Sequence, residues 1–287
     1  MKRLIVIVGP TAIGKTAAAI KLAQELHTEI VSCDSRQFYN ELNIGVARPS
    51  PDELAAATHH FIACRSVTNP YNVFDYEHDA LNLLDQLFQK HDTVIAVGGS
   101  GLYVNALCNG INIMPDPAPG LRERLSAKIA NGELDELLAE LQRLDPDYYA
   151  VVDRRNPIRI QRALEVSITS GRPYSELIGK PLPERPFEIE KRVMRCERDT
   201  LRERIYTRVD KMMEQGLLEE VESLKEYRHL NTLNTVGYKE LFSYLDGKCS
   251  LEQAIIDIKN HTWQYAKKQM TWFGRAEKAP IENQQEI

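Results

Sequence analysis

A glycine-rich loop between an apolar run and a helix-forming stretch is the feature that most constrains the fold of this 287-residue chain. The run Leu4–Val8 leads into Gly9–Thr16, which fits the pattern G-x-x-x-x-G-K-[ST], and Ala17–Leu26 follows with a helical pattern. In this context the loop N–H groups and the free end of the next helix converge on one anion site. Gly9 and Gly14 permit backbone angles and a close approach that a Cβ would forbid. We therefore expect a di- or triphosphate to bind here.

The loop also supplies a charge and a metal ligand. Lys15 places an ammonium group beside the phosphates, and Thr16 provides a hydroxyl suited to Mg²⁺, which is the expected cofactor. The candidate diphosphate-binding residues of the loop are Gly9, Pro10, Thr11, Ala12, Ile13, Gly14, Lys15 and Thr16.

Strands and helices alternate along the first hundred residues. Leu4–Val8, Glu29–Ser32 and Thr93–Val97 are short apolar runs separated by helical patterns, of which Glu77–Gln89 is one. Such runs are typical of a parallel sheet covered by helices on both faces, which binds ligands at the carboxyl ends of its strands. The segments expected to meet at that edge are Gly9–Thr16, Asp34–Gln37 and Gly98–Tyr103.

The pattern becomes helical after Gly110. Prolines at 115, 117 and 119 precede the helical stretches Leu121–Ala130, Leu134–Arg143 and Ile158–Ser170, and a strand-like Ile189–Met194 follows a second proline cluster. The predicted fold class is α/β, with a P-loop parallel-sheet core covered by helices and an all-helical insertion domain. We assign residues 1–115 and 187–287 to the core and residues 116–186 to the insertion. Further core helices are expected at Thr200–Gln215, Leu218–Lys225 and Leu251–Phe273.

Composition excludes several classes of protein. A membrane span needs about eighteen consecutive apolar residues, and no run in the sequence is that long, so no membrane association is expected. The five scattered cysteines form no C-x-x-C pair, which argues against a disulfide framework or a zinc site. We expect a cytoplasmic protein.

The net charge of −5 argues against nonspecific nucleic-acid binding, but a local basic channel can still bind RNA. The basic clusters are Arg154, Arg155, Arg159 and Arg162, and Lys267, Lys268 and Arg275.

The position of the acidic residues argues against simple ATP hydrolysis. A nucleotide hydrolase or kinase would place a carboxylate at the end of a strand opposite the loop to hold Mg²⁺, but Thr93–Val97 ends in Gly98-Gly99-Ser100. The carboxylate stands instead at Asp34, where it could accept a proton from an incoming nucleophile. The alternative role of Asp34 is to cap the following segment in an Asx turn.

Taken together, the motifs resemble the tRNA dimethylallyltransferase family. The resemblance runs in order from about residue 4 to 275, and the ordered set is far more specific than any motif but the phosphate loop. The segments that carry it are Gly9–Thr16, Asp34–Gln37 with Tyr39, Asn43–Pro49, Gly98–Tyr103, Asn156–Glu165, Gly216–Val221, Val236–Glu240 and Tyr265–Phe273.

The resemblance implies transfer of a dimethylallyl group from dimethylallyl diphosphate to N6 of the adenosine just 3′ of a tRNA anticodon. Asp34 would take the proton from the attacking amine, while Lys15, Thr16 and Mg²⁺ would stabilise the leaving diphosphate. Arg198 and Arg204 align with arginines expected to reach the diphosphate, although they could equally be surface charges of a helix.

The resemblance also implies a tRNA partner that is bound partly by the helical insertion, with the target base extruded into a channel. The implied tRNA-binding residues are Asp34, Ser35, Arg36, Gln37, Ser100, Arg122, Ile158, Arg159, Ile160, Gln161, Arg162, Asn234, Thr235, Val236, Gly237, Tyr238 and Lys239. Three positions depart from the family pattern: Ser100 stands for Thr, Trp263 for Arg, and Lys268 for Arg. These departures put details of RNA contact in doubt.

Three other functions stay open from the residues alone. A small-molecule kinase would share the loop, a transferase acting on free adenine nucleotides would share the chemistry, and a noncatalytic nucleotide-binding scaffold would need neither Lys15 nor Asp34. The helical insertion and the basic clusters favour an RNA substrate over the first two. The family resemblance leads us to expect a monomer.

Overall fold

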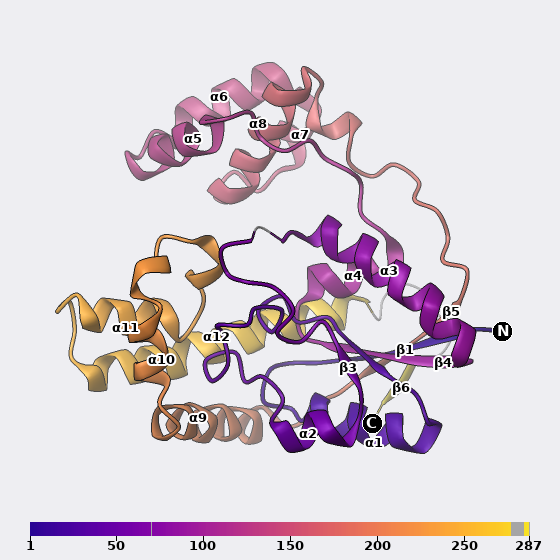
Figure 1. The fold of residues 1–287 in the computed structure, drawn as a ribbon. Helices are drawn as coiled ribbons and strands as arrows, with labels where there is room; N and C mark the ends of the chain where they lie inside the picture. The colour runs from indigo at the N-terminus through magenta and orange to yellow at the C-terminus, as the bar shows by residue number, and fades with distance from the viewer. Residues whose placement is uncertain (70, 277–283, 287) are drawn as a thin grey trace. The chain divides into compact units, whose positions relative to one another are not determined.

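The computed structural model describes residues 1–69, 71–276 and 284–286, and the chain divides into two compact units (Figure 1). Met1–Asn109 and Arg185–Ile287 form the first, here called the α/β unit, and Gly110–Glu184 form the second, the helical unit. The sequence-based boundaries, 116 and 186, lie within the two connections between these units.

The α/β unit is built on a parallel sheet, as the apolar runs predict. Its strand order is β3-β2-β4-β1-β5-β6, and every pair of neighbours is parallel. In the register, Val8 pairs with Gly98 and Ser32 pairs with Val97, so the loops after β1, β2 and β4 leave the sheet at one edge. The strands are β1 (Arg3–Val8), β2 (Ile30–Ser32), β3 (His59–His60), β4 (Thr93–Gly98), β5 (Glu188–Val193) and β6 (Gln284–Glu286).

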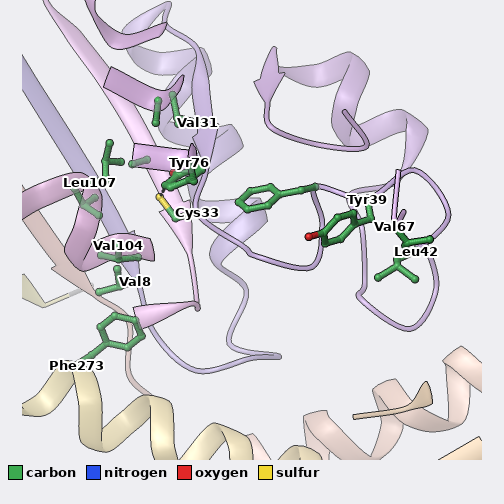
Figure 2. Packing of buried hydrophobic residues seen from close by; sticks show 14 of the residues in the cluster. Val8, Val31, Cys33, Tyr39, Leu42, Val67, Tyr76, Val104, Leu107 and Phe273 are labelled. Atoms are coloured by element: carbon green, nitrogen blue, oxygen red, sulfur yellow. Dashed lines mark hydrogen bonds between the residues drawn. The ribbon is translucent and has the colours of Figure 1, made fainter. Parts of the chain in front are cut away.

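Helices cover both faces of the sheet (Figure 1). On one face Ile5 and Ile7 of β1 pack with Ala19 and Ala23 of α1. The alternate residues of β1, such as Val8, belong to a larger cluster on the other face, together with aromatic and aliphatic side chains from distant segments (Figure 2). The helices of the unit are α1 (Lys15–Leu26), α2 (Pro51–Ala56), α3 (Val73–Lys90), α4 (Gly101–Asn109), α9 (Arg198–Glu214), α10 (Leu217–Ser223), α11 (Tyr238–Leu245) and α12 (Leu251–Ala276).

Two glycines allow the turn from β1 into α1. Gly14 caps α1 with a φ of 101°, a left-handed conformation that side chains rarely adopt. A Cβ on Gly9 would lie 2.9 Å from the carbonyl oxygen of Met194, which closes the loop against the end of β5. The loop is therefore fixed by contacts with a strand almost two hundred residues away in the sequence.

The helical unit has its own core. Its helices are α5 (Leu121–Ala130), α6 (Leu134–Leu144), α7 (Pro146–Val151) and α8 (Pro157–Ser170). Leu125, Leu137, Leu141 and Leu164 meet between these helices. Because the apolar residues of α5, α6 and α8 recur with helical spacing, each of these helices buries one face and leaves the other to water. Within the described ranges, no helix has the length and the apolar character needed to cross a membrane.

Candidate active site

Two adjoining cavities lie within the α/β unit, at the edge where β1, β2 and β4 end. The first, of about 690 Å³, is lined by the phosphate loop and by charged residues of α9. The second, of about 490 Å³, is lined by polar residues and by apolar ones such as Val209 and Ile258. Thr11, Asp34 and Arg208 line both cavities. A carboxylate and a guanidinium therefore stand where the two spaces meet.

Lys15 lies in the first cavity, where burial makes its ammonium group easier to deprotonate. Its Nζ donates a hydrogen bond to the carbonyl oxygen of Pro10, at 2.8 Å. Loss of hydration lowers the pKa of Lys15 to about 8; the nearby Asp34 opposes the shift and the nearby Arg208 adds to it. A bound diphosphate would raise this pKa again, because a nearby negative charge favours the charged form of the ammonium group.

Arg208 is a candidate site residue that the sequence analysis missed. Its Nη1 donates to Oγ1 of Thr11 in the phosphate loop, at 3.0 Å, and burial lowers its pKa. Arg204 also lines the first cavity, with Nη1 3.5 Å from the carbonyl oxygen of Ile13. Arg198, the first residue of α9, is exposed and is not among the described residues that line either cavity. The spacing of i, i+4 between Arg204 and Arg208 was the available signal, because it puts both on one helix face.

Asp34 follows β2, makes the turn weighed as its structural role and lines both cavities. Its Oδ1 accepts a hydrogen bond from the Arg36 N–H at 3.0 Å, which is an Asx turn. The turn occupies Oδ1 of the carboxylate and fixes its orientation. The second oxygen is left to accept from another donor. The turn holds the carboxylate at the junction of the cavities, so the structural role supports the chemical one.

Ser35 and Ser100 join the ends of β2 and β4. The Ser35 N–H donates to Oγ of Ser100 at 3.1 Å, and the two hydroxyls lie 3.2 Å apart. A serine at position 100 therefore keeps the hydroxyl that this contact needs. Ser35, Arg36 and Ser100 all line the second cavity, as do five of the six residues expected at 234–239. Those five are Asn234, Thr235, Val236, Gly237 and Lys239.

Two of the residues expected to contact tRNA have their side chains in the core, so neither side chain is accessible to RNA in this structure. Tyr238 is fully buried, and its hydroxyl donates to Glu220 Oε1 at 2.6 Å. Ile160 is fully buried between the helices of the helical unit. Both belong to motifs that mix accessible and buried residues, and motif membership alone does not say which side of a helix a residue occupies. Gln37 lines the first cavity, but its amide already donates to the carbonyl oxygens of Val46 and Ala47 at 3.2 and 3.0 Å.

Gln269 of α12 is a second residue that the sequence analysis missed. It is buried, and its Oε1 accepts from the Thr11 N–H while its Nε2 donates to the Gly99 carbonyl oxygen, each at 2.8 Å. This one side chain ties the phosphate loop to the turn after β4. Trp263, one of the three departures, packs beside Ile13 of the loop, and Lys268 is exposed. The side chain of Arg275 lies outside the described part of the structure.

The remaining expected RNA contacts lie on the helical unit. Arg122 donates to both carboxylate oxygens of Glu165 at 2.8 and 2.9 Å, and Arg162 donates to the same carboxylate at 3.3 Å. Gln161 donates to Oγ of Ser126 at 2.9 Å. Ile158, by contrast, is 77% exposed, and Arg159 is exposed beside it. The set therefore divides into side chains committed to the buried Glu165 and side chains that face water.

The residues of the first cavity fit a magnesium ion bound together with a diphosphate. Mg²⁺ usually takes one or two protein oxygens and completes its shell with phosphate oxygens and water. Thr16, at the second residue of α1, offers a hydroxyl in this cavity, and oxygens of the diphosphate and of water would complete the shell. No cluster of three or more His, Cys, Asp or Glu side chains suited to a metal occurs in the described ranges.

Comparison with known proteins places the chain in one family. Residues 37–276 match a family model described as IPP transferase. The chain is 47% identical over 277 residues to tRNA dimethylallyltransferase 1 of Bacteroides thetaiotaomicron, covering 96% of this chain and 90% of that protein. It is 48% identical over 270 residues to tRNA dimethylallyltransferase of Christiangramia forsetii, covering 94% of this chain and 89% of the relative.

Solved structures agree with these sequence matches. The tRNA isopentenylpyrophosphate transferase of Bacillus halodurans is 32% identical with a TM-score of 0.70, over 100% of this chain and 90% of that one. A eukaryotic dimethylallyltransferase, whose structure is described as acting on tRNA, is 25% identical with a TM-score of 0.82, over 100% of this chain and 74% of that one. The chain therefore belongs to the IPP transferase family, as its phosphate loop and the ordered motifs after it predict.

Proposed function

We propose that this chain transfers a dimethylallyl group from dimethylallyl diphosphate to N6 of the adenosine 3′-adjacent to the anticodon in tRNA. The products are N6-isopentenyladenosine and diphosphate. The single observation that carries this function is the position of Asp34 at the junction of a phosphate-loop cavity and a second, partly apolar cavity. The relatives that match nearly the whole chain are named for this reaction.

The first cavity is the diphosphate subsite. Lys15, Arg208 and the N–H groups of the loop surround one space, so the charge that builds up on the leaving diphosphate meets fixed positive groups. Arg204 adds a more exposed charge at the same site. Thr16 would hold Mg²⁺ together with the diphosphate oxygens, and the ion, when bound, would neutralise part of the negative charge on the leaving group.

The second cavity is the acceptor subsite. A flipped adenine needs apolar surface for its faces and hydrogen-bonding groups for its edge. Val209 and Ile258 supply apolar surface, whereas Ser100, Asn234 and Thr235 supply polar groups. The base has to leave the anticodon stack to reach this cavity, which unpaired loop nucleotides do at low cost.

The chemical step follows from the junction of the two subsites. The N6 lone pair attacks C1 of the allylic group, the N–C1 bond forms, and the C1–O bond breaks with its electron pair leaving on diphosphate. The amine then carries an extra proton, which passes to the carboxylate of Asp34 and later to water. Positioning both reactants at this carboxylate supplies much of the rate enhancement, because the encounter becomes effectively intramolecular.

The helical unit is proposed as part of the tRNA-binding surface. Ile158 and Arg159 are exposed on it, and Arg154 and Arg155 stand close in sequence and are exposed as well. Phosphate contacts by such arginines give affinity without a base-specific requirement. We further propose that the protein works in the cytoplasm as a monomer, as the family resemblance leads us to expect.

Transfer of a labelled dimethylallyl group tests the function. The donor is labelled dimethylallyl diphosphate, and the acceptors are an anticodon stem-loop with adenosine 3′ of the anticodon, the same stem-loop with guanosine there, and free AMP. Label in the adenosine stem-loop alone is the expected result. Label in AMP alone would assign the enzyme to free nucleotides, and label in none would remove prenyl transfer and reopen phosphoryl transfer from ATP.

A further inference from the structure

One carboxylate outside the two cavities gathers an unusual number of hydrogen bonds. Glu220, in α10, accepts from the backbone N–H groups of Asn43, Ile44 and Gly45 at 3.2, 2.7 and 3.1 Å. It also accepts from the hydroxyl of Tyr238 at 2.6 Å. A carboxylate that accepts three main-chain N–H groups and a phenol fixes the backbone around it, because each of these bonds is assisted by the negative charge.

The groups bound to Glu220 belong to the two segments that form a wall of the acceptor cavity. Gly45 lines the second cavity and begins the stretch Gly45–Ala47, all of which lines it. Tyr238 lies inside the segment Asn234–Lys239, whose other five residues line the same cavity. Glu220 is not itself among the described residues that line the second cavity, but it joins two stretches of its wall that are almost two hundred residues apart in the sequence.

The contact between these segments is close and depends on Gly45. A Cβ at Gly45 would lie 2.5 Å from the ring of Tyr238, so only glycine lets the loop pass the buried phenol. Two residues later, Ala47 has a φ of 47°, in the left-handed region that alanine seldom occupies. A loop with such a conformation persists only where its surroundings hold it.

The phosphate loop is held by different side chains. Gln269 and Arg208 bind Thr11 through its N–H and its hydroxyl, and neither of them contacts Glu220 among the hydrogen bonds of the described residues. The phosphate loop and the wall built on Gly45–Ala47 are thus held by different side chains. Val46 and Ala47 line the first cavity as well as the second, but the basic groups of the first cavity lie on the phosphate loop and on α9. A change at Glu220 is therefore expected to affect acceptor binding more than donor binding.

From this network we propose that Glu220 is a positioning residue for the acceptor base. Its carboxylate fixes Gly45–Ala47 against Asn234–Lys239, so that the wall of the second cavity is already formed when the flipped adenine enters. The proposal rests on the proposed function, because it takes the second cavity as the adenine subsite. Glu220 acts through these segments and is not itself in contact with the reacting atoms.

The test compares two Michaelis constants in Glu220→Gln. The amide keeps one acceptor oxygen but turns an NH₂ group toward main-chain donors, so the wall loses hydrogen bonds made to a charge. We expect KM for the adenosine stem-loop to rise by about tenfold or more, while KM for dimethylallyl diphosphate changes by less than about twofold. Tyr238→Phe, which keeps the ring at Gly45 and removes one of the four bonds, should shift the same KM by a smaller factor.

The matched control is Glu222→Gln, which removes the same charge from an exposed position on the same helix. It should leave both constants unchanged. Equal rises of both constants in Glu220→Gln, accompanied by a lower Tm, would mean general destabilisation and would overturn the proposal. An unchanged KM for the stem-loop would overturn it as well.

Amide hydrogen exchange without any substrate separates this proposal from the proposed function. The Ile44 and Gly45 amides should exchange faster in Glu220→Gln than in the unmodified chain, with the Thr11 amide unaffected. If the unmodified chain transfers no dimethylallyl group, the proposed function fails whatever exchange shows. If it transfers the group and the exchange at Ile44 and Gly45 is the same in both proteins, the positioning role of Glu220 fails alone.

Discussion

The two units of this chain use their charged residues in opposite ways. In the α/β unit, Asp34, Lys15 and Arg208 come from three segments and line one pair of cavities, where burial lowers the pKa of Lys15 and of Arg208 and the nearby Asp34 opposes both shifts. In the helical unit, Arg122 and Arg162 converge on the buried Glu165, at the centre of the unit's polar network. The first arrangement leaves charge directed into a cavity, and the second uses charge to hold helices together.

This difference indicates where chemistry and affinity reside. A charge that faces a cavity is available to a ligand, whereas a paired one contributes to folding. Arginines of the helical unit that are exposed, such as Arg159, are free to add phosphate contacts to a bound RNA. The comparison therefore predicts that changes in the α/β unit alter the transfer step or donor binding, and that changes on the helical surface alter only tRNA affinity.

The largest effect is expected for Asp34→Asn. The amide keeps the size of the side chain and can still accept from the Arg36 N–H, but it cannot take a proton from the amine. Single-turnover transfer should fall by about 10²-fold or more, while the Kd for dimethylallyl diphosphate stays within a few fold. Rapid quench measures the transfer rate, and isothermal titration calorimetry measures the Kd. An unchanged transfer rate would take Asp34 out of the chemical step and leave only its Asx turn.

Arg208→Gln should have the next largest effect, which falls on kcat/KM for the donor, dimethylallyl diphosphate. The variant can still donate a hydrogen bond to Thr11 but loses the charge beside the diphosphate. We expect kcat/KM for dimethylallyl diphosphate to fall by about 10- to 100-fold, the usual worth of a charge-assisted contact to phosphate. Arg198→Gln is the control on the same helix and should change little. A loss in Arg198→Gln as large as that in Arg208→Gln would show that the helix's overall charge, rather than the position of Arg208, is what matters.

Donor binding should also depend on pH through Lys15. Its pKa in the free protein is lowered to about 8 by burial, and a bound diphosphate favours the charged form. The affinity is therefore fully developed below pH 8 and falls as the pH rises above it, by up to about tenfold per pH unit until the pKa of the complex is reached. Titration calorimetry across this range measures it. Lys15→Arg, whatever its absolute affinity, should lose this dependence, because arginine stays charged; a decline that persists would assign it to another group.

The smallest effect is expected on the helical surface. Arg159→Ala should weaken tRNA binding a few fold and reduce the slope of log Kd against log salt by about one, with single-turnover transfer at saturating tRNA unaltered. Lys128→Ala removes an equal charge from the same unit, where Lys128 is paired with Glu136 at 2.8 Å. The same change of slope in both variants would mean that the unit acts through its total charge and not through Arg159.

Much of the fold could be predicted because its signals are local. The strands β1, β2 and β4 are apolar runs in the sequence, and glycines mark the ends of β1 and β4. Parallel strands then bring the three ends to one edge of the sheet. The helices α5, α6 and α8 follow from apolar spacing. The two-residue strand β3 and the short helices α2 and α7 were not predicted, because they are too short to show a period.

The site was harder to predict wherever a residue acts through tertiary placement. Arg208 lies in a helix that carries Arg198, Arg202 and Arg204 as well, and only the packing of α9 decides which of them reaches the loop. Gln269 is a neutral residue in a long amphipathic helix and gives no signal of its own. Tyr238 and Ile160 show the converse, since a motif shared with accessible residues concealed that both are buried.

The most direct test of the account is a structure of the protein with an anticodon stem-loop and a thio analogue of dimethylallyl diphosphate that binds without transfer. The account predicts the diphosphate between Lys15 and Arg208, the adenine in the second cavity, and N6 within about 3 Å of the Asp34 carboxylate. An adenine bound elsewhere, or an N6 that contacts another proton acceptor with Asp34 turned away, would contradict it.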